Sequence, residues 1–80
     1  MAATTRDQLV DIVVDELRCS AAEVTDTATM EALGADSLDA WGLVMRLEDE
    51  CAVTISDDEA EAIVTFGDLV ALVERKRSEA

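Results

Sequence analysis

The sequence predicts an all-α fold: a small four-helix bundle of three main helices and one short helix, with a long first loop. Two observations support this prediction. The 80 residues include no proline and only three glycines, a composition that favours helices over a turn-rich β fold. Apolar residues recur at spacings of three and four, and helix-start signals precede these stretches. The length predicts one domain over residues 1–80, with a core at about 5–77.

The first predicted helix begins at Thr5 and ends near Arg18. Thr5 and Gln8 have the spacing of a capping box. Arg18 places a cation at the C-terminal end, where the helix dipole favours positive charge. The apolar stripe of this helix consists of Leu9, Ile12, Val13 and Leu17, broadened by Val10 and Val14.

Residues 19–35 show no clear period and are predicted to form the long loop. Ser20 or Thr25 is a candidate start for a short turn. Gly34 allows a sharp change of direction before the next helix. The residues expected to anchor the loop to the core are Val24, Met30 and Leu33.

The second predicted helix runs from Asp36 or Ser37 to about Cys51, with Asp36 as its N-cap and Asp39 in its first turn. Its apolar residues fall on two stripes. The first stripe consists of Ala40, Leu43, Val44, Leu47 and Cys51. The second stripe consists of Leu38, Trp41 and Met45. One helix of a small bundle rarely buries both of its faces. The second stripe is therefore either part of the core or an exposed patch. We expect Trp41 to contact partner proteins.

Two further helices complete the predicted bundle. Ser56 and Glu59 have capping-box spacing and start a short helix over 57–63. Thr65 caps the last helix, and Asp68 lies at its third position. The apolar side of that helix consists of Phe66, Leu69, Val70, Leu72 and Val73, and its C-terminal cations are Arg75, Lys76 and Arg77.

The charge is strongly negative, with nineteen acidic and six basic residues and a net charge of −13. Half of the residues are apolar, so the composition indicates a folded domain with a negative surface rather than a disordered tail. Such a surface repels nucleic acid and anionic membranes and attracts basic protein surfaces. Acidic residues crowd residues 36–61, where Arg46 is the one base; this run is either a solvated face or a docking face.

Several classes of site are disfavoured. Histidine is absent, which removes the commonest general base and metal ligand. Cys19 and Cys51 lack both the spacing of a zinc site and the further nitrogen or sulfur ligands that it needs, so we expect no metal centre. They are interpreted as small packing residues, with a disulfide as the less favoured alternative. The longest apolar run, 69–73, is far too short to span a membrane. We expect a cytoplasmic monomer.

Ser37 stands at a helix start, where a serine is usually a cap or a surface residue. It is not a hydrolase nucleophile, because histidine is absent and Lys76 lies at the far end of the chain. A helix N-terminus stabilises an attached phosphate, whereas Asp36 and Asp39 would repel it. A modification at Ser37 would therefore need an enzyme that brings its own cations or metal.

The segment from Leu33 to Asp39, Leu-Gly-Ala-Asp-Ser-Leu-Asp, resembles the L-G-x-D-S-L-[DE] signature of acyl carrier proteins, and the similarity extends over about residues 6–75. The resemblance implies that Ser37, in a motif with Asp36, receives 4′-phosphopantetheine from coenzyme A. Acyl groups then travel as thioesters on that arm, sheltered between helices, and the chain itself is not an enzyme. The partner-binding residues that the resemblance implies are Leu38, Asp39, Trp41, Met45 and Glu48.

Three residues depart from the family pattern: Trp41, Gly42 and Ala52 replace a small aliphatic residue, a glutamate and an acid, respectively. These changes favour a specialised pathway, such as a discrete polyketide synthase carrier. The alternatives are a fatty acid synthesis carrier, a peptidyl or aminoacyl carrier, and an acidic interaction module that is never modified. The implied partners are a phosphopantetheinyl transferase, acyltransferases, ketosynthases and other enzymes with basic docking patches.

Overall fold

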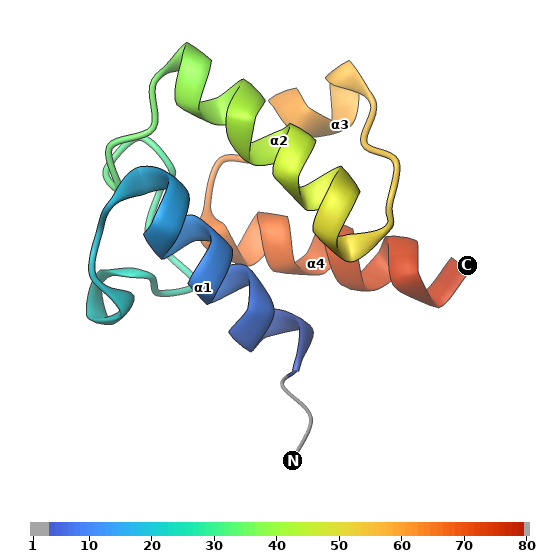
Figure 1. Ribbon diagram of the computed structural model, residues 1–80, viewed down its shortest axis with the longest axis horizontal. Helices are drawn as coiled ribbons and strands as arrows, with labels where there is room; N and C mark the ends of the chain where they lie inside the picture. Colours follow the sequence, from blue (N-terminus) through green and yellow to red (C-terminus); the bar gives the residue numbers. More distant parts are fainter. Residues whose placement is uncertain (1–3, 80) are drawn as a thin grey trace.

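The computed structural model describes residues 4–79, apart from the side chain of Ser37. It contains α1 (Thr5–Leu17), the 3-10 turn η1 (Ala21–Glu23), α2 (Ser37–Cys51), α3 (Asp57–Glu61) and α4 (Phe66–Glu79). Figure 1 shows α1 packed alongside α2, with α4 crossing behind them and the long loop at one side. The only β-type pairing among the described residues is an isolated bridge between Thr29 and Thr65. The all-α prediction is confirmed.

The helix α1 begins at Thr5 as predicted, but its capping box lies one residue earlier than predicted. The N-cap is Thr4, whose hydroxyl accepts a hydrogen bond from the Asp7 N–H at 3.1 Å, while the Asp7 carboxylate accepts one from the Thr4 N–H at 3.4 Å. The predicted box of Thr5 and Gln8 is therefore wrong, because an acid at the third position completes the box and also favours the dipole. The predicted end is confirmed, since Arg18 is the C-cap in the left-handed region, at φ 56°.

One apolar core lies between the three long helices. Its buried side chains are Leu9, Ile12, Val13, Val24, Leu33, Leu43, Val44, Leu47, Cys51, Ile55, Phe66, Leu69, Val70, Leu72 and Val73. The loop anchors are confirmed: Val24 and Leu33 are buried, and Met30 packs against the core. Ala40, which the pattern assigns to the core stripe, is exposed. Its small side chain lines two open pockets beside the core instead of being covered by it.

The long loop is ordered because its backbone bonds to the chain around the start of α4. Phe66 N–H donates to the Ala28 carbonyl at 2.9 Å, and Gly67 N–H donates to the Asp26 carbonyl at 3.0 Å. A Cβ on Gly67 would lie 2.8 Å from that Asp26 oxygen, so glycine is required by the close approach. The Arg6 guanidinium, 2.7 Å from the Asp26 carboxylate, adds a tie to α1. These bonds fix the path that leads into α2.

The last two helices have the predicted caps. Ser56 and Glu59 form the capping box of α3, and Thr65 accepts a hydrogen bond from the Asp68 N–H at 3.1 Å at the start of α4. The predicted range 57–63 for the short helix is two residues too long. Its helical bonding ends because the Ile63 N–H donates to Ala60, a tighter turn that directs Ile63 against the core.

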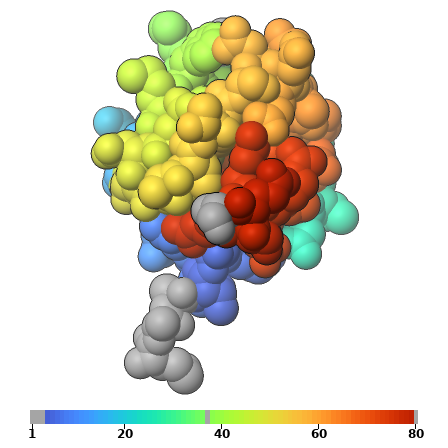
Figure 2. All heavy atoms as spheres, turned by 90° about the vertical axis from the view of Figure 1, so that its right-hand side faces the viewer, coloured from blue at the N-terminus to red at the C-terminus, as the bar shows by residue number. Residues whose placement is uncertain are grey.

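The C-terminal half of α4 ties the bundle together. Figure 2 shows this part of α4 (red) lying between the α2–α3 segment (yellow to orange) and the start of α1 (blue). On the α1 side, the Arg77 guanidinium donates to the Thr5 hydroxyl at 3.0 Å and to the Gln8 side chain at 2.9 Å. Among the described helices, none has the length and apolar character needed to cross a membrane.

Candidate attachment and docking site

The start of α2 has the geometry that its sequence predicts. The Asp36 carboxylate accepts a hydrogen bond from the Asp39 N–H at 2.9 Å, and the Asp39 carboxylate accepts one from the Asp36 N–H at 3.5 Å. Ser37 is the first helical residue. Its side chain lies outside the described residues, while its neighbours Asp36 and Leu38 are exposed. The backbone at Ser37 therefore sits at an accessible, capped helix N-terminus.

Each residue of the turn before α2 has a separate physical role. Leu33 is buried, and the N–H of Ala35 donates to the Met30 carbonyl at 3.1 Å, which holds the turn against the body of the protein. Gly34 has φ 97°, a conformation that side-chain-bearing residues rarely adopt. The turn thus converts an anchored loop into a helix that begins at the surface.

The second apolar stripe of α2 is exposed. Leu38, Met45 and Trp41 are 82%, 66% and 53% exposed. The expectation that Trp41 lies outside the core is confirmed. Three large apolar side chains on one face form a patch of the kind that partner proteins cover.

The two acids predicted beside this patch have structural partners. The Asp39 carboxylate belongs to the capping box of α2. The Glu48 carboxylate accepts a hydrogen bond from the Ile55 N–H at 3.0 Å and so fixes the segment between α2 and α3. This contact runs from the last turns of α2 to the backbone of the segment that follows the helix, so capping and helix-periodicity signals did not indicate it.

A groove of about 300 Å³ runs between α2 and α3 beside the patch. The residues that line it are Ala40, Trp41, Val44, Asp57, Ala60 and Glu61. We call it the Trp41 groove. No motif in the sequence marks Asp57 or Glu61 as site residues, although their spacing of four places both on one face of α3.

A smaller pocket of about 60 Å³ leads into the core from the start of α2. Its lining is entirely apolar and consists of Met30, Ala35, Ala40, Leu43, Val44, Leu47, Ala60, Ile63 and Leu69. An exposed helix start next to an apolar pocket fits an arm that is attached outside and carries an apolar cargo.

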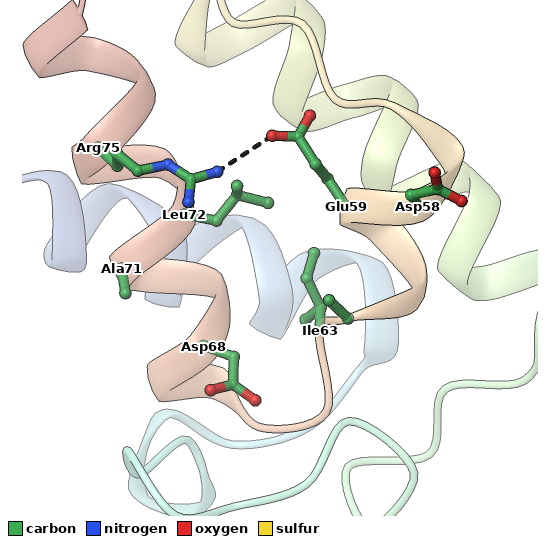
Figure 3. A pocket seen from close by; sticks show the side chains of 8 residues that line it. Asp58, Glu59, Ile63, Asp68, Ala71, Leu72 and Arg75 are labelled. Atoms are coloured by element: carbon green, nitrogen blue, oxygen red, sulfur yellow. Dashed lines mark hydrogen bonds and ion pairs between the residues drawn. The ribbon is translucent and has the colours of Figure 1, made fainter.

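Another pocket, of about 470 Å³, lies between α3 and α4 and is lined by residues of those two helices and the segment between them, not by the start of α2 (Figure 3). Ile63 and Leu72 form part of its floor, and an ion pair closes one rim. There the Glu59 carboxylate accepts hydrogen bonds from Arg75 at 3.1 Å and from Lys76 at 2.8 Å. Its lining includes no cysteine, serine or threonine nucleophile, so we assign the ion pair a structural role: it holds α3, which buries no residue fully, against α4.

The Glu59 contacts predict a pH dependence of stability. The hydrogen bond from Lys76, together with those from Ser56, lowers the pKa of Glu59 from 4.5 to about 2. A lowered pKa stabilises the folded state above pH 4.5, and this contribution disappears as the pH falls from 4.5 to about 2. Glu59→Gln should therefore be less stable than the wild type at neutral pH, and the difference should close over that range.

Urea unfolding at a series of pH values measures this difference. Glu74→Gln is the matched control, because Glu74 is exposed and forms no ion pair among the described residues. A wild-type advantage over Glu59→Gln that persists unchanged down to pH 2 would contradict the assigned role of Glu59.

Arg46, the one base in the acidic stretch 36–61, points to α1 and away from the exposed patch of Leu38, Trp41 and Met45. Its guanidinium bonds to Glu50 and Asp15 and lies 3.3 Å from Glu16, and these carboxylates raise the pKa of Arg46. Gly42 faces the same cluster, since a Cβ there would lie 3.5 Å from the Glu16 carboxylate. A glutamate at this position would bring a second carboxylate toward Glu16, which gives a physical reason for the glycine.

Both cysteines are free thiols. Cys51 is buried in the core, and burial raises the pKa of its thiol, which keeps it protonated and unreactive. Burial also raises the pKa of the half-buried Cys19. Within residues 4–79, no group of three or more acidic or cysteine side chains has the arrangement of a metal site.

These features are typical of a class of protein, the small helical carriers: an all-α bundle in which a capped helix start lies at the surface beside an exposed apolar patch. Residues 7–73 match the family model for the phosphopantetheine attachment site, and the chain belongs to the acyl carrier protein family. Its cofactor is 4′-phosphopantetheine, bound covalently. The crystal structure of an acyl carrier protein from Thermotoga maritima is similar, with 31% sequence identity and a TM-score of 0.80 over 99% of this chain and 98% of that one.

Proposed function

We propose that Ser37 is the serine that carries the 4′-phosphopantetheine arm, and that this chain presents acyl thioesters to the enzymes of a specialised pathway such as polyketide synthesis. The observation that supports the attachment site best is the position of Ser37 as the first residue of α2, directly after the N-cap Asp36. The exposed Leu38 on the other side leaves this helix start open to a modifying enzyme.

The residues around Ser37 bind and orient a phosphodiester rather than catalyse its formation. The unpaired N–H groups and the dipole of α2 favour a phosphate at this end of the helix. Asp36 already accepts a hydrogen bond from the Asp39 N–H, and it offers negative charge in place of a cation. The phosphopantetheinyl transferase must therefore supply the cation and the base. Once attached, the arm supplies a thiol that forms thioesters.

Trp41 and Gly42 support the specialised pathway. Trp41 puts an aromatic side chain, half exposed, on the docking face, and Gly42 leaves a position without charge beside Glu16. Trp41 alters the surface that a ketosynthase or an acyltransferase meets, whereas Gly42 changes the side of α2 that faces α1. The two free cysteines support a reducing compartment such as the cytoplasm, where we propose that the protein works as a monomer.

Intact-mass spectrometry after incubation with coenzyme A and a broad-specificity transferase tests the attachment site. The wild type should gain one phosphopantetheine, and Ser37→Ala should gain none. Ser78→Ala is the control and should gain the arm like the wild type, because Ser78 is exposed near the end of α4. A mass gain in Ser37→Ala would disprove the site, and a wild type that stays unmodified with several transferases would disprove the carrier function.

The loaded protein also tests the pathway. Ketosynthases of polyketide synthesis should elongate its acyl group faster than those of fatty acid synthesis. Equal or inverted rates would contradict the specialised role while leaving the carrier function intact.

A further inference from the structure

Met45 carries a thioether on the exposed apolar patch that it forms with Leu38 and Trp41. Its side chain is 66% exposed and lies one helical turn beyond Trp41 on the same face of α2. We propose that the Met45 sulfur is a reversible oxidation site, at which a peroxide converts the thioether to a sulfoxide and so weakens the binding of partner enzymes to this patch. The inference rests on the proposed carrier function and adds a way in which it is regulated.

The modification is a two-electron oxygen transfer. The Met45 sulfur attacks one oxygen of hydrogen peroxide, the O–O bond breaks, and an S–O bond forms as water leaves. The sulfur is oxidised and the peroxide is reduced, so the step needs no other reagent. A methionine sulfoxide reductase reverses it with a dithiol, which becomes a disulfide while the oxygen leaves as water.

The other sulfur atoms within residues 4–79 are better shielded than that of Met45. Met30 packs against the core, Cys51 is buried and Cys19 is half-buried. Burial raises the pKa of both thiols, which keeps them out of the thiolate form that reacts with peroxides. A thioether has no proton to lose, so its reactivity depends on exposure and not on ionisation. Within the described part of the chain, Met45 is therefore the sulfur that a peroxide reaches first.

The exposure of Met45 in the free protein decides what its oxidation changes. Water hydrates the sulfoxide oxygen there, so the stability of the fold should change little. A partner that covers Leu38, Trp41 and Met45 removes this water and puts apolar groups in its place. The polar oxygen then lies in an apolar interface without a hydrogen bond, which costs free energy. Oxidation therefore acts on docking and not on the fold.

Peptide mass mapping of the chain without its arm, after treatment with hydrogen peroxide at about pH 6, tests the site. The arm is left out because its own thiol would compete for the peroxide. Met45 should gain one oxygen at least about ten times faster than Met30, and methionine sulfoxide reductases should remove it. Equal rates at Met45 and Met30, or an oxidation that begins at Trp41 or Cys19, would overturn the proposal.

The KM of a phosphopantetheinyl transferase for the reduced and the oxidised chain tests the consequence. Oxidation should raise this KM about fivefold or more, and reduction of the sulfoxide should restore it. The melting temperature, followed by circular dichroism, should stay within a few degrees. An unchanged KM would refute the effect on docking, and a large fall of the melting temperature would show that oxidation acts through the fold instead.

Variants assign the effect to one sulfur atom. Met45→Leu keeps an apolar side chain but has no sulfur, so peroxide should leave the KM measured with this variant unchanged. Met45→Gln places a polar group at the same position and should raise the KM without any peroxide. Met30→Leu is the matched control and should keep the full response to peroxide. A Met45→Leu variant that still responds like the wild type would overturn the proposal.

The same assay tells this inference apart from the carrier function. If the reduced wild type gains the phosphopantetheine arm but oxidation leaves the KM unchanged, the inference fails alone. If the reduced wild type gains no arm with several transferases, the carrier function fails, and the regulation that rests on it fails with it.

Discussion

Phe66→Ala is expected to unfold most of the protein at room temperature, whereas Trp41→Ala is expected to leave it folded. These positions hold the only two aromatic side chains of the sequence. Phe66 is 0% exposed at the start of α4, with the Arg6 guanidinium 5.4 Å from its ring centre. Truncating a buried phenylalanine costs about 3–5 kcal/mol. A domain of this size has a free energy of unfolding of about the same magnitude.

Trp41 is the matched control because its side chain is 53% exposed on the surface of α2. Its removal should change the free energy of unfolding by less than about 1 kcal/mol. Circular dichroism during urea unfolding measures both variants. A stable, cooperative Phe66→Ala variant would contradict the position of Phe66 at the centre of the core. A large loss of stability in Trp41→Ala would contradict the exposed position of the indole.

Two glycines inside helices are expected to respond to alanine in opposite ways. Gly67→Ala should destabilise the protein by about 1–3 kcal/mol, because the new Cβ would lie 2.8 Å from the Asp26 carbonyl oxygen and would push the long loop off α4. Gly42→Ala should stabilise it by about 0.5–1 kcal/mol, because glycine is a poor helix former and the new Cβ would meet only the Glu16 carboxylate at an ordinary 3.5 Å.

Thermal unfolding of the two variants under identical conditions measures the contrast. The melting temperature should fall for Gly67→Ala and rise for Gly42→Ala. A loss of stability in both variants would contradict the open environment assigned to Gly42. A gain of stability in both would contradict the close approach of the long loop to α4.

The surface proposed for docking reflects how the charges are distributed in the protein. Arg46 is held at α1 by Asp15 and Glu16 and within α2 by Glu50, and the cations of α4 are held by α1 and by Glu59. Within the described part of the chain, the face formed by α2 and α3 keeps exposed apolar side chains and the acids Asp57 and Glu61, whose side chains form no hydrogen bond or ion pair there. Such a surface attracts basic enzymes quickly and releases them easily, which suits a carrier that visits several partners.

Local signals in the sequence were sufficient for the existence of the helices and for most of their caps. The predicted caps Asp36, Ser56 and Thr65 all exist, and each bonds to the residue three positions on, because these bonds lie within one turn. The cap of α1 was misassigned because two adjacent threonines stand at the start of that helix and spacing alone does not choose between them. The position of Ser37 at a helix start likewise follows from local sequence.

Only the tertiary structure decided which surfaces are free. The spacing of α2 left two apolar stripes, and packing against α1 and α4 buried one and exposed Leu38, Trp41 and Met45. The path of the chain after α2 gave Glu48 a structural role, because the Ile55 N–H comes back to its carboxylate. The groove that joins Trp41 to Asp57 and Glu61 exists because α3 returns beside α2. Local sequence determined the helices and the predicted attachment point, because these depend on hydrogen bonds within one turn. The surface proposed for docking depends on how the helices pack against one another.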